Sequence, residues 1–147
     1  MAELRIVTLA GAESALDETV VERFGSGLRG ELIRPGDAEY EEARQLWNGV
    51  IDKRPALAAR VADEDDVIDS VNFARENDLL LAVRGGGHNV AGTASADGGL
   101  VLDLSAMKHI EVDPERRAVR AGAGVTIGEL DEDTQRHGLA TPMGVVS

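Results

Sequence analysis

The sequence predicts an α+β fold, in which a β-α-β unit is followed by further strands in mixed and antiparallel pairing with packed helices. Two short apolar runs, Ala56–Val61 and Leu79–Val83, have the length of buried strands, and the second ends just before a glycine-rich turn. Between them lies a helical segment that Asp63 can cap and Asn77 can end. A strand, a helix and a strand in this order predict a right-handed crossover between a parallel pair of strands.

The first part of the chain, residues 1–33, is interpreted as an amino-terminal extension or partner-docking arm without visible chemistry. Short apolar pieces alternate there with glycines and charged residues. The stretch Asp17–Phe24 has apolar residues at helical spacing and is expected to form a short helix. Its apolar face consists of Val20, Val21 and Phe24. The remaining residues, 34–147, are expected to form the domain that carries the function.

A second helix is expected after the turn at residues 35–37. Asp37 is a good N-cap, and Asn48-Gly49 is a good stop. The apolar residues of this segment are Tyr40, Ala43, Leu46 and Trp47. Aromatic side chains serve packing more often than ligand stacking, so both aromatic residues of this segment are expected to pack against the core.

The helix between the two predicted strands is amphipathic. Its apolar face is expected to consist of Val67, Ile68, Val71 and Ala74. Its first turn holds the acidic run Glu64-Asp65-Asp66, which the positive end of the helix dipole favours. Helix capping explains these carboxylates better than a metal site does, and no metal site is expected elsewhere in the chain.

Further strands and a last helix are expected beyond the central unit. Asp97-Gly98-Gly99 predicts a turn into a strand at Leu100–Leu104. Residues 109–112 and 118–121 predict the two strands of a hairpin. The helix is expected at Thr126–His137, with Gly138 as its stop.

A glycine-rich segment, Arg84-Gly85-Gly86-Gly87-His88, follows the strand predicted at Leu79–Val83. Consecutive glycines let the backbone bend and point several N–H groups at one anion, a geometry that suits a diphosphate. Arg84 can add positive charge, and His88 would lie beside whatever the loop binds. Glycine content alone also fits an ordinary flexible surface loop. The position after a buried strand favours a binding loop, because ligands of open α/β layers gather at the carboxyl ends of strands.

The run Arg84–Asn89, with Asp97–Ser105 behind it, resembles the pyrophosphate loop of FAD-linked oxidases. These oxidases share the fold of vanillyl-alcohol oxidase and p-cresol methylhydroxylase, the PCMH-type FAD-binding fold. Within them the chain is most similar to the berberine-bridge and 6-hydroxynicotine-oxidase branch. The resemblance runs from about Pro55 to the last residue. It implies that residues 34–147 are the amino-terminal part of a PCMH-type FAD-binding domain that is incomplete at its carboxyl end.

The resemblance implies FAD as cofactor and a set of contacts to it. These contacts are Arg84, Gly85, Gly86, Gly87, His88, Asn89, Gly92, Pro142, Met143 and Gly144. Arg84 and the three consecutive glycines would bind the diphosphate, and His88 would bond covalently to the 8α carbon of the flavin. The other residues would lie near the flavin ring and the ribityl chain. Some relatives carry a cysteine where this chain has Val146, so only one covalent link is implied.

The implied activity is that of a flavin-dependent oxidoreductase. It would take a hydride from a small organic substrate to N5 of FAD and pass the electrons to dioxygen, while the protein binds and orients the reactants. The sequence assigns no substrate base. One alternative is an inactive, truncated FAD- or nucleotide-binding module. Another is a nicotinamide-dependent Rossmann protein, suggested by Gly122-Ala123-Gly124, although the next glycine, Gly128, comes one residue later than that fingerprint requires.

Composition argues against several kinds of partner. The chain has 27 acidic and 15 basic residues and a formal charge of −12, which disfavours nucleic acid and anionic membrane surfaces. The same excess of acid is typical of proteins from salt-adapted organisms. There is no cysteine, which excludes disulfides and thiolate chemistry. No apolar run approaches twenty residues and no secretory signal is visible, so a cytoplasmic protein is expected.

Overall fold

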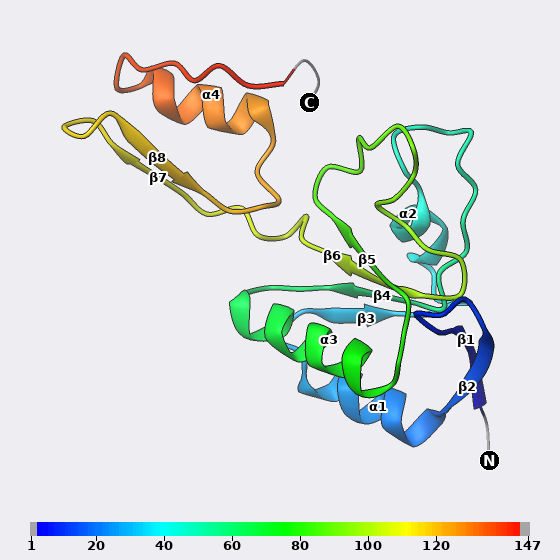
Figure 1. Cartoon of the computed structure of the whole chain (residues 1–147). Coiled ribbons are helices and arrows are strands. Elements are labelled where there is room, and N and C mark those ends of the chain that lie inside the picture. Colours follow the sequence, from blue (N-terminus) through cyan, green and yellow to red (C-terminus); the bar gives the residue numbers. More distant parts are fainter. Residues whose placement is uncertain (1–2, 145–147) are drawn as a thin grey trace.

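A four-stranded sheet in the order β3 (Glu31–Ile33), β4 (Leu57–Arg60), β6 (Leu100–Asp103) and β5 (Leu81–Arg84) carries the predicted glycine-rich segment at the end of β5 (Figure 1). The structure is a computed structural model, and it describes residues 3–144. Its elements in chain order are β1 (Glu3–Val7), β2 (Glu13–Asp17), α1 (Glu18–Gly27), β3 (Glu31–Ile33), α2 (Tyr40–Arg44), β4 (Leu57–Arg60), α3 (Glu64–Glu76), β5 (Leu81–Arg84), β6 (Leu100–Asp103), β7 (Ile110–Asp113), β8 (Ala118–Ala121) and α4 (Ile127–Gln135). The expected α+β class is confirmed.

Both faces of the four-stranded sheet are covered, with α1 and α3 on one face and α2 on the other (Figure 1). Side chains of a strand alternate between the two faces. On the face of α1 and α3 the buried residues include Leu57, Ala59, Leu100 and Leu102. On the face of α2 they include Ala58, Ala82, Val101 and Tyr40. Burial on both sides explains why these strands are continuous apolar runs.

The order of the parallel strands differs from the expectation. β4 and β5 were expected to pair with each other, but both pair with β6, which lies between them. The middle position suits β6, because all four of its residues are buried, whereas β5 leaves Val83 half exposed. A strand whose side chains are buried on both faces suits the middle of a sheet, where neighbouring strands also cover both of its edges.

The interpretation of residues 1–33 as an extension needs correction for the part that the structure describes. β3 pairs antiparallel with β4 and so completes the four-stranded sheet. Val21 and Phe24 of α1 are buried in the same core as the central strands. The ring of Phe24 stacks on that of Phe73 in α3, with centroids 4.0 Å apart. Residues 3–33 therefore belong to the main lobe (residues 3–104), because their apolar side chains need this cover.

The helix α3 begins and ends as predicted, but only part of its expected apolar face faces the core: Ala74 is buried and Val67 packs against the core. The Asp63 carboxylate accepts the N–H groups of Asp65 and Asp66, and Asn77 is the C-cap. The buried residues are Asp66, Ser70, Phe73 and Ala74, while Ile68 and Val71 of the expected face are 57% and 41% exposed. The reason is polar: the carboxylate of Asp66 accepts three backbone N–H groups, from Arg29, Gly30 and Ala62. These bonds outweigh the burial that would raise the pKa of Asp66, and its pKa is lowered.

The helix α2 is shorter than expected. It ends at Arg44, its N-cap is Glu39, and the Asp37 carboxylate instead accepts the N–H of Arg34. Tyr40 is buried as predicted, and its hydroxyl donates to the carbonyl of Pro55. Trp47 lies beyond the end of the helix and is 64% exposed, so the prediction that it packs in the core is wrong.

A second lobe (residues 105–144) contains the hairpin of β7 and β8 and the helix α4, and it stands apart from the sheet (Figure 1). The predicted hairpin is confirmed, with Ile110 opposite Ala121. The helix α4 starts at a capping box in which the Thr126 and Glu129 side chains bond to each other's backbone N–H. The hydrogen bonds that Glu129 accepts from Lys108 and Thr126 lower the pKa of Glu129 to about 2. Gly138 has a φ of +67°, as expected for a helix stop.

Two kinds of feature are absent from residues 3–144. None of the helices there is both long enough and apolar enough to span a bilayer. Nor do three or more His, Cys, Asp or Glu side chains gather there in a way that could hold a metal ion.

Candidate functional site

The glycine loop, residues 85–89, leaves the carboxyl end of β5, at the sheet edge where β4 and β6 also end. Within residues 3–144, the N–H groups of Gly85, Gly86, Gly87 and His88 donate to no backbone or side-chain acceptor. Gly87 has a φ of +72°, which glycine adopts without strain. A turn with several N–H groups that have no acceptor among the described residues is the kind of backbone geometry that can bind an anion.

Two of these positions leave no room for a side chain. A Cβ on Gly85 would lie 2.9 Å from the carbonyl oxygen of Ala123, and one on Gly86 would lie 2.9 Å from Cδ2 of His88. The loop thus touches the second lobe through Gly85 and the imidazole through Gly86. The absence of side chains here is a packing requirement as well as a source of flexibility.

Arg84 does not direct its charge at the glycine loop. Its guanidinium is buried and donates from Nη2 to Oδ2 of Asp103 over 2.6 Å. Its Nη1 donates to the carbonyls of Ala43 and Gln45, the latter over 3.3 Å. The expected role of Arg84 as the cation for a diphosphate therefore differs from the structure, in which its charge is neutralised inside the sheet edge. Sequence could not show this, because Asp103 is opposite Arg84 only through strand register.

The pair belongs to a row of alternating charges across the sheet. Glu31, Arg60, Asp103 and Arg84 are register partners on β3, β4, β6 and β5. Nε of Arg60 lies 3.4 Å from Oδ2 of Asp103, and its Nη1 bonds to Glu31. Burial acts to raise the pKa of Asp103, but the hydrogen bond and charge of Arg84 outweigh it, so the pKa is lowered. Asp103 stays ionised and fixes the base of the glycine loop.

His88 is half buried and lies against Trp47. The ring centroids are 5.6 Å apart and the planes are inclined by 35°. The N–H of Trp47 donates to the carbonyl of Gly87 over 3.4 Å. Sequence reasoning missed Trp47 as a site residue. Its place directly before Asn48-Gly49, a helix stop, is the one signal that could have indicated a loop position.

Asn89 and Gly92 form the return of the loop. Oδ1 of Asn89 accepts the N–H of Thr93 over 3.2 Å, and its carbonyl accepts the N–H of Gly92. Gly92 has a φ of +71°, and a Cβ there would lie 2.9 Å from the Ile51 side chain. The side chain of Asn89 is exposed, whereas Gly92 is buried. Gly92 therefore lets the return of the loop pack closely against the side chain of Ile51.

The third expected contact segment lies in the second lobe. Pro142, Met143 and Gly144 are exposed and follow α4 in the chain (Figure 1). Met143 is 52% exposed. Val146, the position compared with the cysteine of some relatives, lies outside the described residues. The glycine pair at residues 122 and 124 is closely packed, with N–H groups that donate to the carbonyls of His109 and Met107, so it offers no open dinucleotide loop.

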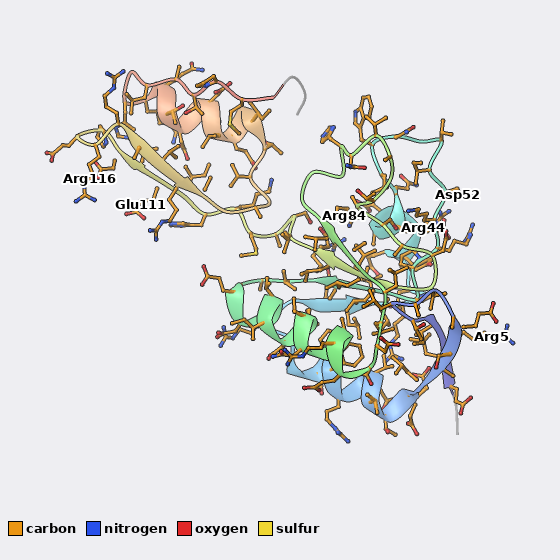
Figure 2. All side chains as sticks on the ribbon, in the orientation of Figure 1. Arg5, Arg44, Asp52, Arg84, Glu111 and Arg116 are labelled. Atoms are coloured by element: carbon orange, nitrogen blue, oxygen red, sulfur yellow. The ribbon has the colours of Figure 1, made fainter. Side chains whose placement is uncertain are left out.

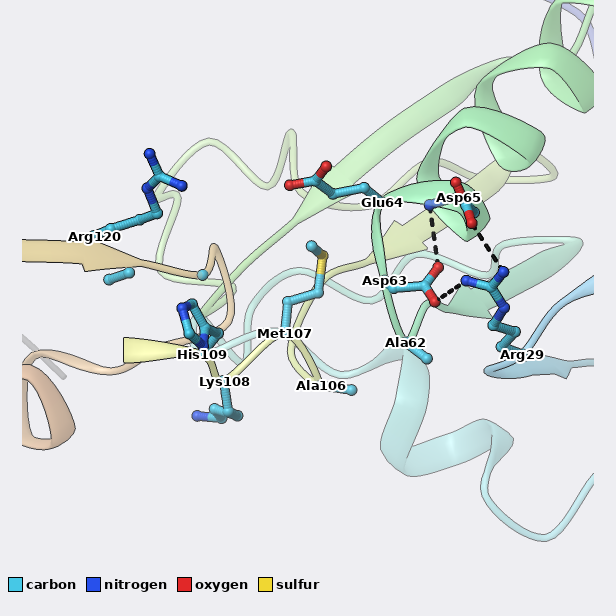
Figure 3. Close-up of a pocket in the computed structure, with 12 residues that line it drawn as sticks. Arg29, Ala62, Asp63, Glu64, Asp65, Ala106, Met107, Lys108, His109 and Arg120 are labelled. Atoms are coloured by element: carbon cyan, nitrogen blue, oxygen red, sulfur yellow. Dashed lines mark hydrogen bonds and ion pairs between the residues drawn. The ribbon is translucent and has the colours of Figure 1, made fainter. Parts of the chain in front are cut away.

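A cavity of about 760 Å³ lies elsewhere, between the start of α3 and the hairpin (Figure 3). One wall carries Asp63 and Asp65, which bind Arg29, and the other carries Lys108 and His109. No residue of the glycine loop lines this cavity. The size of this cavity therefore does not identify the candidate site. The candidate site is the glycine loop after β5, whose N–H groups have no acceptor among the described residues.

Comparison with known proteins places the chain among flavoproteins. A family model described as "FAD binding domain" matches residues 55–147. The chain is 40% identical over 118 residues to (R)-6-hydroxynicotine oxidase of Paenarthrobacter nicotinovorans. This alignment covers 80% of this chain and 26% of that protein. It is 36% identical over 129 residues to an FAD-linked oxidoreductase of Dictyostelium discoideum, covering 87% of this chain and 28% of that protein.

Solved structures agree. The crystal structure of 6-hydroxy-D-nicotine oxidase from Arthrobacter nicotinovorans aligns with a TM-score of 0.73 at 40% identity, over 76% of this chain and 24% of that one. Aclacinomycin oxidoreductase aligns with a TM-score of 0.69 at 30% identity, over 78% of this chain and 24% of that one. The carbohydrate oxidase from Microdochium nivale, at 22% identity and a TM-score of 0.75, shows the shared fold alone. The chain spans about a quarter of the length of these relatives.

Proposed function

The chain belongs to the family of FAD-binding domains, and we propose that its N–H groups at Gly85, Gly86, Gly87 and His88 hold the diphosphate of FAD. The resemblance to FAD-linked oxidases of the 6-hydroxynicotine-oxidase and berberine-bridge type is confirmed. The observation that carries the proposal is that these four N–H groups have no acceptor among the described residues. A buried N–H group without an acceptor is costly, which applies most to Gly87, and a diphosphate oxygen would supply an acceptor.

The loop fits such a ligand in shape as well. The three consecutive glycines present no side chain to a ligand, and Gly87 has the positive φ that occurs in backbone nests. Because Arg84 is neutralised by Asp103, the loop would attract the diphosphate by backbone dipoles rather than by a guanidinium. The exposed amide of Asn89 and the segment at residues 142–144 are proposed as contacts to the rest of the cofactor.

His88 is proposed as the residue that bonds to the flavin. Attachment replaces an N–H bond of imidazole and a C–H bond of the 8-methyl group by one C–N bond, and dioxygen takes up the two hydrogens as hydrogen peroxide. His88 is suited to this role because it is half exposed at the end of the glycine loop. The His88 imidazole would then hold the flavin in place against dissociation.

The whole protein is proposed to be a flavin-dependent oxidoreductase acting on a small organic substrate, with dioxygen as the electron acceptor. When bound, FAD supplies the hydride acceptor at N5. The relatives are named oxidases and oxidoreductases, which supports this class of reaction. The alternative is a binding module without activity of its own, because the chain spans only about a quarter of those enzymes.

Diphosphate binding is tested by titrating the chain with FAD and with riboflavin, which lacks the diphosphate, with ADP as a competitor. FAD should bind at least about tenfold more tightly than riboflavin, and ADP should displace it. Gly87→Ala should weaken FAD binding, because alanine resists a φ of +72°. Gly11→Ala is the matched control, with a φ of +80° and open space around it. Equal binding of riboflavin, or an unaffected Gly87→Ala variant, would contradict the proposal.

Covalent attachment is tested separately, by incubating the chain with FAD under air and precipitating it with acid. Flavin absorbance should remain with the protein in the wild type and in His109→Ala, whose histidine is 69% exposed in the second lobe. It should be lost in His88→Ala. Acid-stable colour in His88→Ala, or none in the wild type, would refute the link while leaving diphosphate binding intact.

A further inference from the structure

The imidazole of His88 has two close neighbours in the folded chain. One is Gly86, whose missing side chain leaves room for Cδ2 and Nε2 of the ring. The other is the indole of Trp47, at a centroid distance of 5.6 Å. A side chain that meets surfaces on two sides loses rotamer freedom, so the ring is held in one orientation.

The backbone that carries Trp47 is held by contacts between two loops. Arg84 donates to the carbonyl of Gln45, two residues before Trp47. The backbone N–H of Trp47 donates to the carbonyl of Gly87, and the side-chain amide of Asn48 donates to the carbonyl of Val90 over 3.1 Å. These bonds hold the segment 45–48 beside the glycine loop, within reach of His88.

Trp47 contributes little to the core. It is 64% exposed, whereas Tyr40 of the preceding helix is 5% exposed and well packed. An exposed tryptophan gains little from the hydrophobic effect, so replacing it should change the stability of the fold little. Its contact with His88 is a specific one, since a flat aromatic face restricts the tilt and rotation of a neighbouring ring.

We propose that Trp47 is a positioning residue for His88. Its indole keeps the imidazole of His88 in a single orientation at the end of the glycine loop. The side chain of His88 therefore already has the rotamer in which a ring nitrogen faces the flavin. This inference rests on the proposed attachment of flavin to His88. Fixing the reacting group in advance lowers the barrier to bond formation without changing how tightly the diphosphate is held.

The test compares one affinity and one rate in three variants. In Trp47→Leu, the dissociation constant for FAD before attachment should stay within about twofold, while the rate of acid-stable incorporation should fall about tenfold. Trp47→Phe keeps an aromatic face and should recover most of that rate. Val50→Ala is the control, because Val50 is in the same loop and 88% exposed. A merely structural role would instead change FAD affinity and incorporation together.

A second measurement needs no cofactor. Trp47 is the only tryptophan of the chain, so ring-current shifts of the His88 imidazole protons in NMR spectra report on this one pair. The shifts should vanish in Trp47→Leu and persist in Val50→Ala. If Trp47→Leu incorporates flavin at the wild-type rate, the positioning role is refuted and the proposed function stands. If the wild type incorporates none, the attachment proposal fails and the positioning role fails with it.

Discussion

Arg84 and Asp103 form the buried ion pair on which the glycine loop stands. The side chain of Asp103 is 1% exposed and that of Arg84 is 9% exposed. Neither group could be buried alone, because a charge in the protein interior needs a partner and hydrogen bonds to offset its loss of water. Arg84 has both, since it also donates to two carbonyls near the end of α2. The pair therefore joins the sheet, the helix and the loop at one point.

Removing one partner of this pair should lower the stability of the fold. In Asp103→Asn, the guanidinium of Arg84 keeps its charge but loses its carboxylate, and the free energy of unfolding should fall by about 3–5 kcal/mol. Asp52→Asn is the matched control, because Asp52 also pairs with an arginine, Arg44, but is 68% exposed (Figure 2). It should cost less than about 1 kcal/mol. Urea unfolding curves compare the two, and equal effects would contradict the buried role of Asp103.

The same pair predicts an acid dependence of stability. The pKa of Asp103 is lowered in the fold, so its contribution is complete above the unfolded value of about 3.9 and is lost as the pH falls through the lower, folded value. The stability of the wild type should therefore decline below about pH 4. The decline should be shallower in Asp103→Asn, which has no carboxylate to protonate there. Unfolding free energies measured between pH 2 and 7 check this, and parallel profiles would refute it.

At the scale of elements, α3 shows how polar contacts decide which face a helix buries. Its cap at Asp63 and its end at Asn77 follow from local chemistry and were predicted. Its rotation was predicted only in part, because Val67 and Ala74 of the apolar face expected from sequence pack against the core, whereas Ile68 and Val71 are exposed. The three N–H groups that Asp66 accepts come from residues 29, 30 and 62, and only the fold brings them together.

This rotation makes opposite predictions for two residues of α3. Phe73→Ala removes a buried ring that stacks on Phe24 and should lower the free energy of unfolding by about 3–5 kcal/mol. Ile68→Ala should change it by less than about 0.5 kcal/mol, because Ile68 is 57% exposed. Thermal or urea unfolding measures both. A large loss in Ile68→Ala would support the apolar face predicted from sequence instead.

At the scale of the whole molecule, the two lobes differ in how much they bury. The apolar core lies in the main lobe, around the central strands and the helices α1 and α3. In residues 105–144, only Gly124, Leu130 and Thr134 are buried. The lobes meet where Gly85 approaches the carbonyl of Ala123 and where Met107 packs on the main core. The glycine loop is therefore built on the more stable lobe and touches the less stable one.

This difference predicts uneven hydrogen exchange. Segments with few buried apolar contacts open locally at low free energy, whereas core strands exchange only on global unfolding. In the 147-residue chain, amides of β6 should be the most protected, and those of β8 and α4 should exchange at least about a hundredfold faster. Mass spectrometry of exchanged peptides measures this directly. Similar protection in both lobes would show that the second lobe is stabilised as firmly as the first.

The sequence alone determined the local features: the glycine loop after a buried strand, the cap and end of α3, the stop after α4, and the hairpin of β7 and β8. Each of these depends on residues that are neighbours in the chain, where backbone conformation and capping chemistry act. It also carried the resemblance to FAD-linked oxidases, through the ordered run from Arg84 to Ser105.

The tertiary structure alone decided the position of β6 between β4 and β5, the pairing of Arg84 with Asp103, and the contact of Trp47 with His88. Each of these joins residues that are distant in the chain, so local pattern carries no information about them. Strand order and charge pairing follow from which surfaces must be buried together, and that is settled only when the whole core packs.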